Sequence, residues 1–213
     1  MTPLDSGGPS PTAVDRVADA VRAEILTGAL PADAPLREEA ASERYGVSRH
    51  TVRAAFQRLV AERLAVAVPY RGVRVTSFDR ATIIALQQLR AALEVEAVRI
   101  AGERFGEVWP DAAVAPAREA LEQLAASVDW LEAERVHAEF HHALVAASGS
   151  SRIVEAHAAL GGELLLFLLH VRPHYTLESL VAEHGALLDD VQSRGPDAIR
   201  EHLAHSTRLL VGE

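Results

Sequence analysis

The chain has 213 residues, enough for two small domains, and its 49% hydrophobic and 24% charged residues are typical of a globular protein. It contains no cysteine, which excludes disulfides and thiolate metal sites. The longest apolar run, residues 164–169, is too short to span a bilayer, and residues 1–12 lack the features of a signal peptide. We therefore expect a cytoplasmic protein with no membrane partner and a disordered tail over residues 1–12.

The net charge of −9 argues against a nucleic-acid partner, but the charge is unevenly distributed. All 21 basic residues are arginines, and seven of them fall within residues 44–74, where Glu62 is the only acidic residue. A local basic block of this kind is the electrostatic footprint of a DNA-binding protein.

The first predicted domain spans residues 13–76 and is mainly helical. Thr12 and Ser48 are good caps for its first and third helices. A tight turn that contains Gly46 joins the second helix to the third, as in a helix-turn-helix. The predicted helices cover residues 13–29, 36–45 and 49–63.

Two short strands are predicted directly after the third helix, over residues 64–68 and 73–75. In this position they form the β-hairpin wing of a winged helix-turn-helix. The first turns of the third helix would enter the major groove, and the wing tip would reach the minor groove or a phosphate. The alternative is that the arginines only solvate a polar face. The candidate DNA-contacting residues are Arg37, Arg49, His50, Thr51, Arg53, Arg71 and Gly72.

Four motifs in this domain occur together: Leu36-Arg-Glu-Glu, Gly-Val-Ser-Arg49, Thr51-Val-Arg53 and Tyr-Arg-Gly72-Val. As a set they resemble the DNA-binding domain of GntR-type regulators. The resemblance implies that Arg49, Thr51 and Arg53 contact the operator and that Gly72 marks the wing. His50 and the pair Ala54-Ala55 depart from the residues usual in that family, which leaves the operator sequence open.

A linker over residues 77–79 leads to the second predicted domain, residues 80–213, in which no strand is expected. Apolar residues recur there at helical spacing, with interruptions at glycine and proline. Six or seven helices with short connections predict an antiparallel all-α bundle. The helical patterns cover residues 79–104, 111–127, 130–147, 151–171, 176–193 and 196–210.

Nine of the ten histidines lie in this second domain. His137 and His141 are four residues apart and project from the same face of a helix. With His184 on a later helix and His202 or His205 on the last one, inward imidazoles from three helices could bind Zn, Ni, Mn or Fe. Any single histidine is more simply a surface residue or a hydrogen-bonded core residue. That is our interpretation of His157, His170 and His174.

Three motifs of the bundle resemble the FadR-type effector domain, often called FCD, of GntR regulators: Leu89-Arg90 with Glu94, Phe140-His141 with Ala143-Leu144, and Glu183-His184. Many members bind a divalent metal through an Asp, a His four residues later, the His of Glu-His and a His near the C-terminus. The resemblance implies the ligands His137, His141, His184 and His205, with His202 as the alternative to His205.

His137 stands where those members have Asp, so the predicted site has four imidazoles and favours Zn, with Ni or Mn as alternatives. His205 is preferred because its distance from His184 along the chain is closer to that of the family, whereas His202 better matches the local pattern. Arg90 has two interpretations of equal weight: it neutralises a carboxylate effector, as the resemblance implies, or it pairs with Glu94 one helical turn later.

Together these features predict a homodimeric transcription regulator, most simply a repressor, that binds operator DNA and responds to a small organic acid. One alternative is a metal-independent DNA-binding dimer with no effector. A metal-dependent hydrolase is the other, but no HExxH signature is present, and an enzyme has no use for a wing.

Overall fold

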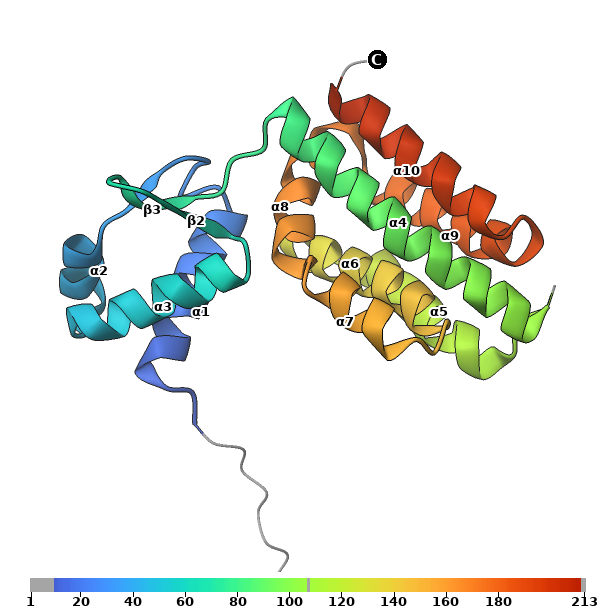
Figure 1. Ribbon diagram of the computed structural model, residues 1–213, viewed down its shortest axis with the longest axis horizontal. Coiled ribbons are helices and arrows are strands. Elements are labelled where there is room, and N and C mark those ends of the chain that lie inside the picture. Colours follow the sequence, from blue (N-terminus) through green and yellow to red (C-terminus); the bar gives the residue numbers. More distant parts are fainter. Residues whose placement is uncertain (1–9, 107, 212–213) are drawn as a thin grey trace, which may run out of the picture. The chain divides into compact units, whose positions relative to one another are not determined.

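The computed structural model describes residues 10–106 and 108–211, and it divides into two compact units between Ser77 and Phe78 (Figure 1). Most of the predicted tail, residues 1–9, lies outside the described residues. The predicted fold class is confirmed: the first unit is a winged helix-turn-helix, and the second is built from helices alone in its described part.

The helix-turn-helix of the first unit follows from local capping. Thr12 forms a capping box with Asp15, and Ser48 accepts a hydrogen bond from the backbone N–H of Thr51. Gly46 ends the second helix in the left-handed conformation, at φ 64°. The three helices are α1 (Ala13–Leu26), α2 (Glu38–Tyr45) and α3 (Arg49–Ala61).

The wing has three strands rather than the two that were predicted. The additional strand, β1 (Pro35–Leu36), pairs antiparallel with β3 (Gly72–Val75), which also pairs with β2 (Ala65–Val68), so the sheet order is β1-β3-β2. Two residues that begin with proline carry no strand pattern, so only the pairing with β3 reveals β1. Leu36, which is buried, anchors this strand.

The second unit contains seven α-helices in its described residues, as the sequence predicted. One predicted helix, over residues 151–171, is instead two helices bent by 51° on either side of residues 159–160, where Gly161 and Gly162 follow directly. The helices are α4 (Arg80–Phe105), α5 (Asp111–Ala126), α6 (Trp130–Ala146), α7 (Ser151–Ala158), α8 (Gly161–Val171), α9 (Leu177–Ser193) and α10 (Pro196–Val211). A 3₁₀ turn, Arg172–His174, follows α8.

The long helix α4 packs against α10 and α6, and α5 packs against α6 and α9. The core between them is aliphatic apart from a few aromatic rings such as Phe140, which is fully buried. Within the described residues no single helix is long and apolar enough to cross a membrane; only the bent pair α7–α8 has the required length and composition. Side chains of α4, α5, α6, α9 and α10 form the interior of the bundle.

Candidate functional site

The predicted recognition residues lie at the start of α3, where Arg49, His50 and Arg53 are exposed. Arg53 donates to both carboxylate oxygens of Glu38, at 2.8 and 2.7 Å, and Arg49 forms an ion pair with Glu39. Both carboxylates belong to the first turn of α2. These two arginines are therefore paired with acids that solvent reaches, Glu39 more than Glu38, and DNA phosphates can replace such acids because the pairs contribute little to stability.

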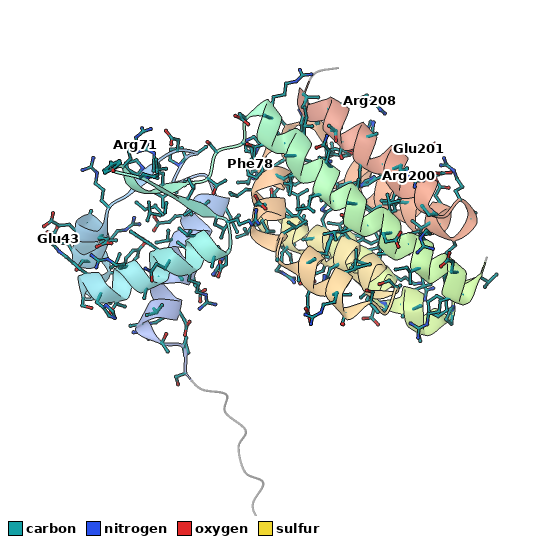
Figure 2. All side chains as sticks on the ribbon, viewed as in Figure 1. Glu43, Arg71, Phe78, Arg200, Glu201 and Arg208 are labelled. Carbon is teal, nitrogen blue, oxygen red and sulfur yellow. The ribbon has the colours of Figure 1, made fainter. Side chains whose placement is uncertain are left out.

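Arg71 and Gly72 lie at the turn of the β2–β3 hairpin, and both are exposed (Figure 2). A groove beside the wing, about 420 Å³ in volume, brings Arg37 to the same surface as Arg71. Arg74 also lines this groove, but its guanidinium is held by Asp33 at 2.6 Å. The structure thus joins Arg37 to the wing and ties Arg74 down.

Tyr70, next to Arg71, is a residue of this surface that the sequence did not single out. Its φ is 62°, in the left-handed region that bulky residues avoid, and its side chain is fully exposed. Nothing within the unit compensates for the conformation by burying the ring. The signal available in the sequence was an aromatic residue in a turn that favours glycine.

The second unit brings His137, His141 and His184 together in its interior. One ring nitrogen from each lies within 4.8 Å of the others, and all three side chains are buried. The Nε2 atom of His184 is 2.7 Å from Nε2 of His137 and 3.3 Å from Nε2 of His141. Three imidazole nitrogens from α6 and α9 therefore face one small volume.

Hydrogen bonds of the Nδ1 atoms fix the tautomers of two of these rings. The Nδ1 atom of His184 is 2.8 Å from the carbonyl oxygen of Leu180, which can only accept, so Nδ1 carries the proton. The Nδ1 atom of His141 likewise donates to Glu94, at 3.0 Å. In both neutral rings the Nε2 lone pair then points at the shared volume.

Burial sets the charge state of the cluster. It lowers the pKa of His184 and His137 well below the ordinary value, helped by the neighbouring histidines, and it lowers the pKa of His141 to about 4 despite Glu94. Burial would raise the pKa of Glu94, but Arg90, His141 and His157 lower it well below its usual range. Neutral histidines beside an ionised carboxylate result.

This donor set fits a divalent metal. Two lone pairs 3.3 Å apart match the separation of about 3.3–3.4 Å between nitrogen ligands of tetrahedral Zn, given Zn–N distances of about 2.0–2.1 Å. The 2.7 Å separation is shorter, so His137 would have to move outward. Among the described residues, His137 Nδ1 is one of only two buried side-chain polar atoms without a hydrogen-bonding partner.

Of the two C-terminal candidates, the structure places His202 beside the cluster. Its ring centroid is 4.8 Å from that of His184 and 5.2 Å from that of His141, and its Nδ1 is held by Glu183 at 3.0 Å. His205 is exposed and lines a surface pocket. This geometry favours His202 over the predicted His205, because the buried face of α10 carries Ile199 and Leu203 and turns His205 outward.

Of the two interpretations of Arg90, the structure shows the ion pair with Glu94. Arg90 pairs with Glu94 at 2.8 Å, as the helical spacing predicts, but the pair is buried, with each residue only 2% exposed. Gln87 accepts a second hydrogen bond from Arg90, at 3.1 Å. His157, interpreted as a core residue, contacts the same carboxylate at 3.2 Å. These residues form a hydrogen-bonded network next to the histidine cluster. From the sequence, only the pair of Arg90 with Glu94 could be predicted.

A winged helix-turn-helix followed by a separate helical bundle with a buried histidine cluster defines the class of a bacterial transcription regulator. Residues 13–75 match the family described as bacterial regulatory proteins, gntR family, and residues 85–208 match the FCD domain. The chain therefore belongs to the gntR family and carries an FCD domain.

Its relatives include repressors. The chain is 27% identical to the "Probable D-xylose utilization operon transcriptional repressor" of Paenarthrobacter nicotinovorans, over 91% of this chain and 85% of that protein. It is 29% identical to the transcriptional repressor GlaR of Escherichia coli K12, over 84% and 87%. A solved "transcriptional regulator GntR" from Rhodococcus sp. RHA1 is 26% identical, with a TM-score of 0.73 over 93% of this chain and 97% of that one. The chain is thus a DNA-binding transcription regulator and not an enzyme, so the hydrolase alternative falls away.

Proposed function

We propose that this regulator holds a divalent metal, most simply Zn²⁺, at His137, His141 and His184, with His202 as the fourth imidazole. The support is that the Nε2 atoms of His141 and His184 lie 3.3 Å apart and that neither carries a proton, so both lone pairs are available to a metal. When bound, the metal would supply a positive charge to which an anionic effector can coordinate. Glu94, Glu183 and the Leu180 carbonyl orient the rings around it.

The effector is a small organic acid that binds beside Arg90. A buried guanidinium next to the histidine cluster is the cation suited to a carboxylate, although Glu94 holds it in the absence of effector. The effector can act only if it binds one arrangement of the dimer better than another. Residues 80–213 would form the domain that binds the effector and dimerises.

Two copies of the first unit in a homodimer would bind a pseudo-palindromic operator in the cytoplasm and repress transcription, as the names of the relatives suggest for those proteins. Arg49, Thr51 and Arg53 would read or position the major groove. Arg37, Tyr70, Arg71 and Gly72 would form the contact at the wing.

Metal analysis and DNA binding test the two halves of this proposal separately. Purified protein should contain close to one Zn²⁺, Ni²⁺ or Mn²⁺ per chain by elemental mass spectrometry, and His184→Ala should lose it. His174→Ala is the matched control, because His174 is exposed outside the cluster. An equal metal content in His184→Ala and wild type would refute the site.

If the His184→Ala protein is free of metal but still binds its own upstream promoter fragment, DNA binding does not depend on the metal. The variant would then have lost only the metal site. The 2.7 Å contact between His137 and His184 favours this second candidate, a metal-independent dimer, since a single proton shared between those nitrogens also satisfies them. Wild-type protein that is free of metal and unresponsive to organic acids would establish it.

A further inference from the structure

Glu134 carries the second buried polar atom that has no hydrogen-bond partner in the described part of the chain. It lies on α6, one turn before His137, and is only 2% exposed. Its Oε1 atom accepts no hydrogen bond from any described residue. The unpaired nitrogen of His137 belongs to a side chain of the proposed metal site, but that site does not explain the unpaired oxygen of Glu134. A buried carboxylate without a partner costs stability, so its presence needs an explanation.

Glu134 lines a small, partly open cavity near the beginning of α6. The other walls of this cavity are Trp130, Leu168, Arg172, Tyr175 and Leu180. The volume open to the centre of a water-sized group is about 10 Å³. The cavity therefore has room for one such group and no more. Two aromatic rings and two leucines make the walls largely apolar.

The polar groups of the walls do not satisfy Glu134. Tyr175 donates its hydroxyl hydrogen bond to Glu183, so that hydroxyl is engaged elsewhere. Arg172 acts on Glu134 only through its charge, and its guanidinium stacks over the Trp130 ring at 5.4 Å, where it is exposed. Burial, opposed by Arg172, raises the pKa of Glu134 to about 7. The Oε1 atom of Glu134 therefore lacks a hydrogen-bond donor among the described residues.

The size and charge of the cavity select among possible occupants. Water would satisfy the oxygen but add no positive charge to the one that Arg172 supplies. A divalent cation such as Ca²⁺ or Mg²⁺ requires about six oxygen ligands, and here there is one carboxylate. A guanidinium or quaternary ammonium is too large for the space, and the latter has no N–H donor. A primary ammonium has the size of water, one positive charge and three donors, and its charge suits the aromatic walls.

We propose that this cavity binds the primary ammonium group of a small amine, with Glu134 as the acceptor and Trp130 and Tyr175 as the walls. The site requires neither a metal at the histidines nor an acid at Arg90. Its ligand would be a primary amine whose remaining atoms extend past Arg172 toward solvent.

Titration with ethylammonium chloride tests the site, with ethanol and tetramethylammonium chloride at equal ionic strength as comparison ligands. Trp130 is one of only two tryptophans, so its fluorescence reports on occupancy. We expect a saturable change at millimolar ethylammonium and none with the other two. No saturable change, or an equal response to tetramethylammonium, would overturn the proposal.

The variant Glu134→Gln keeps the shape and removes the charge, and it should weaken ethylammonium binding by about tenfold or more. Glu139→Gln is the matched control, because Glu139 lies on the same helix but is exposed and paired with Arg135. Equal affinity of Glu134→Gln and wild type would refute the role of the carboxylate. If Glu134→Gln does not fold by circular dichroism, the three ligands on wild-type protein still decide.

Discussion

The candidate sites of the two units place their ion pairs in opposite environments. In the first unit Arg49 and Arg53, proposed to meet DNA, are exposed and paired with acids that solvent reaches, as Arg53 is with Glu38. In the second unit the pair of Arg90 with Glu94 is buried and shared with two histidines. Exposed pairs are weak and exchange readily, whereas breaking a buried pair leaves a charge without solvent. One unit is suited to exchange partners, and the other to hold a fixed arrangement.

The largest effect should come from removing the carboxylate of the buried pair. Glu94→Ala leaves the Arg90 guanidinium buried without its partner and should lower the free energy of unfolding by about 3–5 kcal/mol. Chemical denaturation monitored by circular dichroism measures it. Glu96→Ala, on the same helix, removes an exposed partner of Arg99 and should cost no more than about 1 kcal/mol. Similar losses in the two variants would contradict the comparison.

On the exposed side, Arg53→Ala should weaken operator binding by about tenfold, equivalent to about 1.4 kcal/mol, and leave the bundle folded. If Arg53 contacts a phosphate, the slope of log affinity against log salt should fall by about 1. Fluorescence anisotropy on the upstream promoter fragment gives both quantities. Arg99→Ala, an exposed arginine of the second unit, serves as control. Unchanged affinity in Arg53→Ala would show that α3 is not the recognition helix.

Substitution of Tyr70 should affect the stability of the fold and the affinity for the operator differently. Tyr70→Gly relieves the left-handed backbone, so it should not lower the unfolding free energy and can raise it by up to about 1 kcal/mol. The same change should weaken operator binding severalfold with an unaltered salt slope, since no charge is lost. Thermal unfolding and anisotropy measure the two. A variant that is destabilised and binds normally would assign Tyr70 to the fold.

The smallest effect concerns the acids that occupy the recognition arginines. Glu38→Gln frees Arg53 from a pair worth at most about 1 kcal/mol, so operator affinity should rise by no more than about fivefold. Glu43→Gln, an exposed acid of the same helix, is the control. A decrease in affinity would mean that Glu38 orients Arg53 for DNA rather than competing with it.

Local rules were sufficient for the helices of the first unit. Caps at Thr12 and Ser48 and the glycine at position 46 define the helix-turn-helix without knowledge of tertiary contacts. Strand β1 could not be predicted, because a two-residue strand has no period and depends on its partner. The break between α7 and α8 likewise lies inside a continuous apolar pattern, where packing rather than periodicity decides the bend.

The candidate site was only partly accessible. Helical spacing placed His137 and His141 on one face, but nothing local indicates that Glu94 and Glu183 would hold the rings. The choice between His202 and His205 was open to a simple test. At about 100° per residue, His202 lies roughly 70° from the centre of the stripe formed by Ile199, Leu203 and Ser206, whereas His205 lies roughly 130° away.

The burial of the histidine cluster bears on the rate at which a metal ion would exchange rather than on its affinity. His141 and His184 are each 1% exposed, so an ion held there could leave only when the bundle opens. Its exchange rate would follow the opening of α6 and α9 and not the concentration of free metal outside. A competing chelator should therefore remove the ion at a rate independent of chelator concentration and accelerated by mild denaturant. On the timescale of transcription, such an ion would be a fixed part of the protein.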